Sequence, residues 1–265
     1  MTIATIHQIF THPIKGLTPH PSEKVFLKAG HGITGDRAFA LIHTENGIQP
    51  PSTIPWKPKG NFAMQNDWPG LAALDCYYDN LTNTLTVKHK GVLLLQSRTD
   101  TQEERNLISA FFTGYLASLH PTDTARHPQK NPLYLVGNTK EDTRYPDREP
   151  VHISLIGQAT LDIISEAANS PVDARRFRPN FVIKGIPAWE EFNWIEKQFQ
   201  LGEAKICITA RIGRCANIDV NPETGDRDLS LFSLLPKKFG HAQTGVLATV
   251  INSGSVAIGD TLTLA

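Results

Sequence analysis

The chain has 265 residues, enough for one large domain or two modest ones and for a sizeable core without disulfides. Its 26 basic and 26 acidic side chains give a formal net charge of zero. This excludes a nucleic-acid binder that depends on a global positive field, although a local basic pocket stays open. Three cysteines, an odd number, cannot complete a disulfide framework, so a reducing compartment is expected.

The sequence predicts neither a membrane helix nor a signal peptide. No apolar run approaches the roughly 20 residues that a membrane-spanning helix needs. The N-terminal residues lack the basic region followed by an apolar one that marks a secretory signal. We therefore expect a soluble, cytoplasmic protein that binds neither a membrane nor nucleic acid.

The first hundred residues contain short apolar runs bounded by turn residues, a pattern typical of strands. A helix is predicted over Glu103–Leu116, because its apolar side chains recur at three- and four-residue spacing. The segment from His120 to Pro150 is polar and proline-rich, so we expect a loop that links two halves and holds one short strand. The strands predicted up to this point are Ile3–Phe10, Lys24–Leu27, Arg37–His43, Asp75–Tyr78, Thr84–Lys88, Val92–Leu95 and Leu133–Val136.

The second half mixes predicted strands with two short helices. The helices span Gln158–Ala168, whose large aliphatic side chains share one face, and Leu229–Phe239. Many short strands with few helices favour a mainly β fold, either a barrel or a sandwich. The predicted strands are His152–Ile156, Arg176–Lys184 and Gln200–Arg211, followed by a terminal hairpin of Gly245–Asn252 and Val256–Leu264.

Three arginines stand close together just before an apolar strand, at Arg175, Arg176 and Arg178. If this segment is extended, Arg176 and Arg178 share a face with Asn180, and Arg175 points away. Two guanidinium groups and an amide on one face suit a phosphate, because guanidinium forks match phosphate oxygens in a bidentate way. The alternative is a solvated basic edge that pairs with nearby carboxylates.

A second basic cluster surrounds Cys215, with Arg214 beside it and Arg211 close by. A thiolate is a nucleophile and a soft-metal ligand, and positive charge nearby favours it over the thiol. Cys215 is therefore a candidate metal ligand, and the alternative is a core cysteine beside surface arginines. Cys76 and Cys207 lie in apolar strand patterns and are expected to be buried fillers.

Near the N-terminus, Lys15 and Arg37 are further cations of the kind that bind phosphate. The alternative for Arg37 is an exposed surface pair with Asp36, which would contribute little. His152 could orient a cysteine, but its place in an apolar strand favours a core histidine. The carboxylate pair Glu190 and Glu191, between two tryptophans, is expected to anchor a loop.

Taken together and in order, these pieces resemble the MOSC family, named for the molybdenum cofactor sulfurase C-terminal domain. The resemblance is nearest to the amidoxime-reducing component proteins and their bacterial relatives, which carry an N-terminal β-barrel domain before the MOSC domain. The matching motifs are His12–Gly16, Gly35–Arg37, Leu155–Leu161, Arg176–Asn180, Glu191–Trp194, Arg214–Cys215 and Val220–Gly225. The family has serine where this chain has Gly16, and the relatives' pocket serine before the Arg-Cys pair is Gly213 here.

The resemblance implies a mainly β fold in two domains with a few short helices. It implies a barrel-like N-terminal domain over residues 1–120, a linker over 121–150 and a MOSC β-barrel over 151–265, with the cofactor in the cleft between them. It also implies that Cys215 ligates the molybdenum of a molybdopterin cofactor. The residues implied to hold that cofactor are Lys15, Arg37, Thr160, Arg176, Arg178, Asn180, Gly213 and Arg214.

The function implied is a molybdenum oxidoreductase that reduces small N-hydroxylated compounds. The sequence has no ferredoxin-type cysteine set and no flavin or nicotinamide fingerprint, so the electrons are expected from a separate donor protein. One alternative is a molybdenum cofactor carrier or sulfur-transfer protein, in which Cys215 is a transient ligand or bears a persulfide. A third possibility is a barrel that has lost the cofactor.

Overall fold

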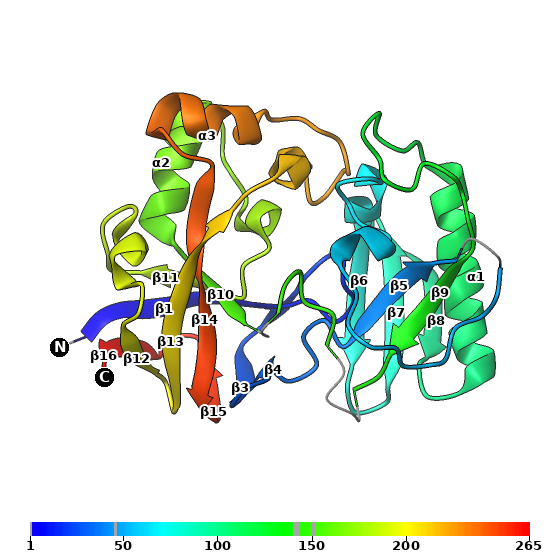
Figure 1. The fold of residues 1–265 in the computed structure, drawn as a ribbon, viewed down its shortest axis with the longest axis horizontal. Helices are drawn as coiled ribbons and strands as arrows, with labels where there is room; N and C mark the ends of the chain where they lie inside the picture. The colour runs from blue at the N-terminus through cyan, green and yellow to red at the C-terminus, as the bar shows by residue number, and fades with distance from the viewer. Residues whose placement is uncertain (1, 45–46, 140–143, 150–151) are drawn as a thin grey trace.

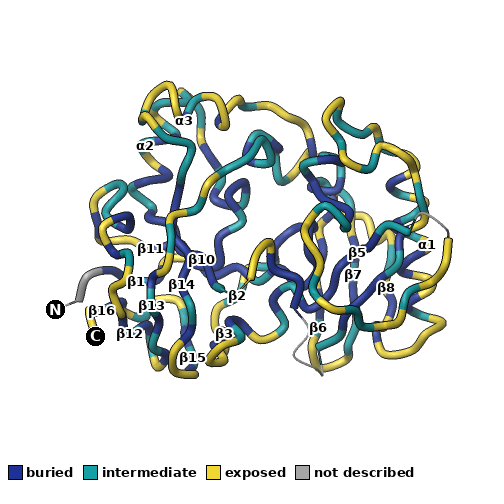
Figure 2. Tube along the Cα trace, viewed as in Figure 1, coloured by how far each residue is buried: buried dark blue, intermediate teal, exposed yellow. Residues whose placement is uncertain are grey.

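Two β-rich halves lie side by side in the computed structural model (Figure 1), which describes residues 2–44, 47–139, 144–149 and 152–265. The predicted mainly β fold is confirmed, with three α-helices in the described residues. The expected linker over 121–150 is partly outside these residues, at 140–143 and 150, as is the position where the second domain was expected to begin. Both halves have a buried interior (Figure 2). In the described residues, no helix is long and apolar enough to cross a membrane.

Seven strands close into a barrel in the left half of Figure 1. Neighbours pair in the order β11-β10-β14-β13-β12-β16-β1, and β1 pairs back with β11. Only β10 and β11 are parallel among these pairs, and helix α2 (Gln158–Ala168) follows β10 in the connection between them. The strands are β1 (Thr2–Thr11), β10 (Ile153–Gly157), β11 (Phe181–Lys184), β12 (Gln198–Leu201), β13 (Ala204–Gly213), β14 (Gln243–Asn252) and β16 (Thr261–Leu264).

The barrel core consists of aliphatic and aromatic side chains that alternate inward along the strands, such as Ile206 and Ile208 of β13. Helices α2 and α3 (Leu231–Phe239) pack together at one end of the barrel, where Leu161, Ile164 and Leu235 share a second cluster. Short 3-10 helices form several connections: η1 (Lys59–Asn61), η2 (Pro69–Ala73), η3 (Ala174–Phe177), η4 (Glu190–Trp194) and η5 (Ala216–Asp219).

The first strands of the chain pack with the C-terminal half, although Ile14 and Leu17 between them belong to the core of the other half. Strand β2 (His20–Ser22) extends the barrel sheet beyond β1, and β3 (Lys24–Lys28) lies between β4 (Gly32–Ile33) and β15 (Gly254–Ala257). Apolar side chains of β1, β3 and β4 belong to the barrel core. The hydrophobic cores therefore group the chain differently from a division at residue 120.

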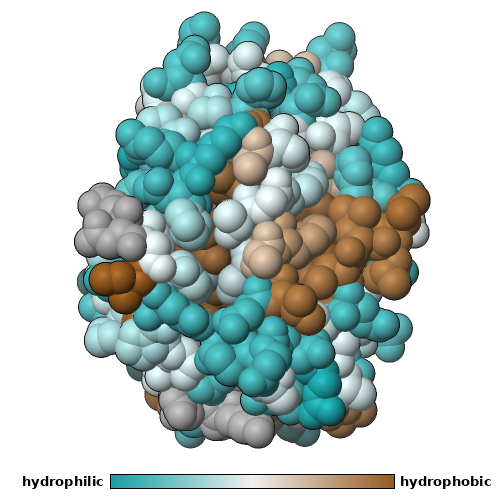
Figure 3. Space-filling view, turned by 90° about the vertical axis from the view of Figure 1, so that its right-hand side faces the viewer, coloured by the Kyte–Doolittle hydropathy of each residue, from teal (hydrophilic) through white to brown (hydrophobic). Residues whose placement is uncertain are grey.

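The right half of Figure 1 packs two small sheets against helix α1 (Gln102–Ser118). One sheet contains β6 (Leu74–Asp79), β7 (Thr84–His89) and β8 (Val92–Arg98), and the other contains β5 (Phe39–His43) and β9 (Leu133–Gly137). Helix α1 covers the C-terminal part of β8, where Ser97 is buried and donates to the Glu104 carbonyl. The start of β8 stays exposed at Val92, Leu93 and Leu94, and apolar surface gathers on this face of the molecule (Figure 3).

Most predicted elements are confirmed, and Gln158–Ala168 has the predicted bounds. The terminal hairpin is wrong, because β15 pairs with β3 and β16 pairs with β1 and β12. The single strand over Gln200–Arg211 is wrong because a turn at Gly202, with φ +55°, separates β12 from β13. The strand expected from Arg176 begins at Phe181, because the Asp173 side chain accepts from the Arg175 amide and starts a 3-10 turn.

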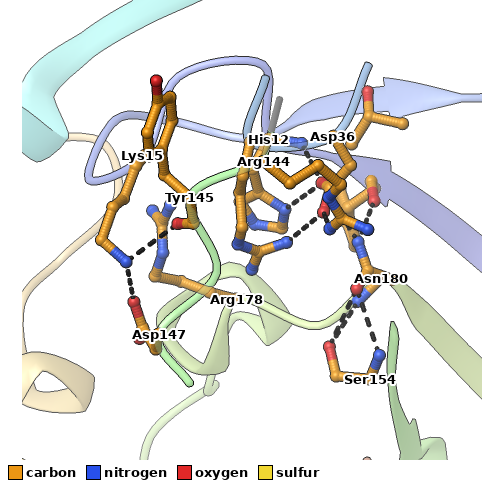
Figure 4. Close-up of polar contacts among 12 residues, drawn as sticks. His12, Lys15, Asp36, Arg144, Tyr145, Asp147, Ser154, Arg178 and Asn180 are labelled. Atoms are coloured by element: carbon orange, nitrogen blue, oxygen red, sulfur yellow. Dashed lines mark hydrogen bonds and ion pairs between the residues drawn. The ribbon is translucent and has the colours of Figure 1, made fainter. Parts of the chain in front are cut away.

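The carboxylate of Asp36 joins the two halves (Figure 4). It accepts from the His12 amide at 2.7 Å, from Arg144 at 2.7 Å, from Arg37 at 2.5 Å and from the Asn180 amide group at 3.3 Å. Asp36 is fully buried, so the alternative of an exposed surface pair with Arg37 is wrong. Burial alone would raise the pKa of Asp36, but Arg37, His12 and Arg144 hold it well below its usual range.

Arg105 fixes α1 to the sheets of its half. Its buried guanidinium donates to the carbonyls of Thr99 and Gly137 at 3.0 Å, Leu135 at 2.8 Å and Ser52 at 3.1 Å. We expect Arg105→Met to lower the free energy of unfolding by about 3 kcal/mol, because buried carbonyls lose a charged donor. Urea unfolding measures this loss. Arg98→Met, at an exposed arginine, is the control and should leave the midpoint unchanged; equal losses would contradict the role of Arg105.

Asp36 should make stability depend on pH. A carboxyl with a lowered folded-state pKa contributes stability that is complete above its unfolded pKa of about 3.9 and is lost as the pH falls through the folded value. We expect Asp36→Asn to cost about 3–5 kcal/mol at pH 7, because two guanidinium groups lose their carboxylate. The difference from wild type should shrink in urea unfolding at pH 3. A difference that does not change with pH would contradict an electrostatic role.

Candidate functional site

A cavity of about 450 Å³ lies between the two halves and is lined by residues of both. Seven of the nine residues that the sequence analysis assigned to the site line it: Lys15, Arg37, Arg176, Arg178, Gly213, Arg214 and Cys215. A larger and more open cleft of about 750 Å³ is lined by His20, Tyr77 and Asn80 among others, but its described lining residues include no cysteine and only one lysine or arginine, Lys24. The chemistry predicted from the sequence therefore gathers in the smaller cavity.

Two of the assigned residues do not line this cavity. Thr160 is fully buried; its hydroxyl donates to the Glu191 carboxylate at 3.0 Å and accepts from the Trp189 amide at 2.9 Å. Glu191 also accepts from the Gly157 amide at 3.1 Å, so it anchors its loop to the start of α2 as expected. The structure does not bring Thr160 to the other site residues.

Asn180 lies behind the cavity wall. Its carbonyl oxygen accepts from the Ser154 amide at 3.1 Å, and its amide group donates to Asp36 and to the Phe10 carbonyl. These contacts tie β1 and β10 to the buried Asp36. Asn180 thus supports the wall that carries Arg37 without lining the cavity itself.

The arginine segment reaches the cavity by a route that strand alternation did not predict. Arg176 lies within the 3-10 helix η3 (Ala174–Phe177), and Arg178 ends that helix with a left-handed φ of +52°. These angles turn both side chains into the cavity, whereas Arg175 pairs outside it with Asp173 and Glu223. Arg176 is paired with Asp228 at 2.7 Å, but its buried Nε atom has no hydrogen-bond partner among the residues that the structure describes.

Positive charge dominates the cavity. Of its described lining residues, eight are lysine or arginine and one, Asp147, is acidic. Arg178 and Arg214 have no carboxylate within 4 Å in the described part of the chain; Arg178 donates to the Leu17 carbonyl at 2.6 Å, and Arg214 donates to the Phe177 carbonyl at 2.9 Å and to Thr244. Burial lowers the pKa of Arg178 to about 10 and of Arg214 to about 9, and both stay charged at neutral pH.

Lys15 is buried in the cavity wall, in the turn that follows β1. Its Nζ donates to the Tyr145 carbonyl at 3.0 Å and to the Asp147 carboxylate at 2.5 Å (Figure 4). The next residue, Gly16, has φ +83°, and a side chain there would collide with the Ala63 carbonyl oxygen. This close approach explains why the serine of the family pattern is a glycine in this chain.

Cys215 follows β13 directly and lines the same cavity with a half-buried, free thiol. Arg214 beside it is half-buried and donates to the Phe177 and Thr244 carbonyls. The position of Gly213 leaves open space where a Cβ would lie. Cys76 is buried as expected, whereas Cys207 is only half-buried.

The sequence analysis misplaced Arg211 and missed part of the cavity wall. Arg211 stacks on Phe192, with its guanidinium carbon 4.5 Å from the ring centroid, and does not line the cavity. His152 does line it, because β10 begins one residue later. The missed charged residues, Lys59, Arg126, Asp147 and Arg148, lie in polar segments without periodicity, so no pattern signalled them.

The cavity fits a ligand that combines an anionic group with a soft metal. Two half-buried guanidinium groups, those of Arg178 and Arg214, have no carboxylate partner among the described residues, and together with the buried Nε of Arg176 they call for an anion. The free thiol of Cys215 lines the same cavity and is a ligand that soft metals prefer. A molybdopterin cofactor, with its phosphate and its metal, has both groups.

Both parts of the chain match known domain families. Residues 3–126 match the MOSC N-terminal beta barrel domain, and residues 142–263 match the MOSC domain. Mitochondrial amidoxime-reducing component 1 of Mus musculus is 24% identical over 238 residues, which cover 85% of this chain and 68% of that protein. Molybdenum cofactor sulfurase of Oryza sativa subsp. japonica is 34% identical over 127 residues, which cover 42% of this chain and 15% of that protein.

Among solved structures, the YuaD protein from Bacillus subtilis aligns with 99% of this chain and 94% of its own, at 12% identity and a TM-score of 0.45. The two matched domains follow one another in the order that the sequence motifs predicted. The chain therefore belongs to the MOSC family.

Proposed function

We propose that this protein binds a molybdenum cofactor through Cys215 and reduces small N-hydroxylated compounds. The observation that carries the proposal is the position of a free, half-buried thiol in the same cavity as two half-buried guanidinium groups, those of Arg178 and Arg214, which lack carboxylate partners in the described part of the chain. The similarity to a protein named amidoxime-reducing component supports the substrate class. A cavity of about 450 Å³ is within the range of cofactor sites.

The lining residues divide into two roles. Arg178, Arg214, Arg37 and Lys15 would hold the phosphate and pterin of the cofactor, because they converge as charged donors. Cys215 would supply the protein's ligand to the metal. Thr160 and Asn180 would act through other residues. Thr160 positions the Glu191 loop, and Asn180 positions Asp36, which in turn positions Arg37.

When bound, the cofactor supplies the two-electron redox chemistry at its metal. Reduction of an N-hydroxylated compound consumes two electrons and two protons and gives the reduced nitrogen compound and water. The electrons would come from a separate donor protein. The chain's own residues orient the cofactor, compensate its charge and keep the thiol at the cavity wall, where Ile212 and Gly213 leave room for a small substrate.

The second candidate is a molybdenum cofactor carrier or sulfur-transfer protein. The similarity to a molybdenum cofactor sulfurase over 127 residues favours it, and so does a thiol that a passing ligand can reach. In this case Cys215 would be a transient ligand or would bear a persulfide.

The test uses protein produced with molybdate. Bound molybdenum and a visible absorption spectrum, followed by turnover of an amidoxime or hydroxylamine with an artificial reductant, would establish the oxidoreductase. Cofactor transfer to an apo-enzyme without turnover would favour the carrier. Absence of molybdenum from the wild-type protein would contradict both.

We expect Cys215→Ala to abolish bound molybdenum without unfolding the protein, because the thiol lies at a cavity wall and not in a core cluster. Metal analysis and thermal melting measure the two effects. Cys207→Ala is the matched control, since Cys207 is also a half-buried free thiol but does not line the cavity. A large fall in melting temperature with the metal retained would mean that Cys215 is only a packing residue.

We expect Arg178→Ala to weaken cofactor retention by about 2 kcal/mol, the scale of a charge-assisted contact. The measurement is the fraction of cofactor that stays bound through dialysis. Arg175→Ala serves as the control, because Arg175 pairs with Asp173 and Glu223 outside the cavity. Equal retention in wild type and Arg178→Ala would remove Arg178 from the cofactor site.

A further inference from the structure

Lys15 and Asp147 form an ion pair of unequal partners. The Lys15 side chain is 1% exposed, whereas the Asp147 side chain is 55% exposed. Lys15 has a second contact with the Tyr145 carbonyl, but Lys15 is the only described side chain to which Asp147 is bonded. Lys15 is therefore fixed in the cavity wall. The Asp147 carboxylate can turn away from Lys15 into solvent and loses only one contact when it does.

Asp147 is also the one acidic group among the described residues that line the cavity. In Figure 4, Arg178 lies between the Lys15–Asp147 pair and the network around Asp36. The carboxylate stays charged, because Lys15, Arg37 and Lys59 hold its pKa below the usual range although desolvation opposes them. In the absence of a ligand, Asp147 is thus the internal counter-ion for several cations.

An anionic ligand group that enters the cavity is attracted by these cations and repelled by the Asp147 carboxylate. Like charges at a few ångströms repel, so the ligand and the Asp147 carboxylate compete for Lys15. Asp36 cannot yield in this way, because it is fully buried and bonded to four donors. Asp147 can turn to solvent and regain its hydration.

We propose that Asp147 is a placeholder anion that neutralises Lys15 until a phosphate group of the ligand displaces it. The proposal rests on the proposed function, in which the cavity takes a phosphate-bearing cofactor. Displacement favours groups with two negative charges over singly charged ones, because only the former outweigh the carboxylate that they replace. Asp147 therefore acts as a specificity residue: it lowers the affinity of the cavity for weak anions and leaves strong ones able to bind.

The test measures binding of inorganic phosphate to the cofactor-free protein by titration calorimetry at pH 7.5. Asp147→Asn should bind phosphate about tenfold more tightly than wild type, because it removes one like charge and frees Lys15. Glu149→Gln is the matched control, since Glu149 is an exposed carboxylate two residues away that does not line the cavity. Its affinity should equal that of wild type.

Equal or weaker phosphate binding by Asp147→Asn would overturn the proposal, because Asp147 would then serve to position Lys15. If Asp147→Asn melts well below wild type, Asp147→Ser carries the same expected gain. Adding Arg178→Ala to Asp147→Asn should remove the gain, and a gain that persists would place the phosphate elsewhere and also overturn the proposal. Phosphate binding is read without molybdenum, so failure to load the metal would contradict the proposed function and leave this result standing.

Discussion

The structure depends on how the charge of buried guanidinium groups is compensated where the two halves meet. Asp36 compensates Arg37 and Arg144 and is itself fully buried, so it has little capacity left for another cation. Arg178 and Arg214 are half-buried in the same wall, and no described carboxylate pairs with either. Burying charge without a partner is costly, and a cavity that keeps such a surplus is stabilised by a bound anion. The lack of carboxylate partners for Arg178 and Arg214 in the described chain is thus the basis for proposing an anion-binding site here.

Two residues with a left-handed backbone conformation line this same cavity. Arg37 and Arg178 both have a left-handed φ, +53° and +52°, which non-glycine residues adopt at a cost of about 1 kcal/mol or more. Arg37 lies in the turn before β5 and Arg178 ends the 3-10 helix before β11, and both line the cavity. An extended segment would place alternate arginines on opposite faces. The strained turns instead bring cations from separate elements to one cavity, and this favours a binding role for these angles over a purely structural one.

The sequence was sufficient for most of the elements and for seven residues that line the cavity. Apolar side chains at three- and four-residue spacing predicted α1 and α2. The clusters predicted around Arg176 and Cys215 line one cavity. Local patterns could not predict which strands close the barrel, because β1 pairs with β11 and β16, which lie far along the chain. Nor could they show that Thr160 is bonded to Glu191, since a hydroxyl at a helix start can face either way. Asp147 was missed because its segment carries no periodic pattern.

A net charge of zero excludes a global positive field, yet this chain carries a strongly positive cavity. The two facts are compatible because the surplus of cations in the cavity is balanced by acidic residues elsewhere on the chain. A field confined to a cleft with low-dielectric walls is focused there and is screened over the outer surface. Such a distribution attracts a small anion that can enter the cavity and offers nothing comparable to an extended polyanion. It suits a compact phosphate-bearing cofactor, and the thiol of Cys215 then lies within the same enclosed volume as its charged end.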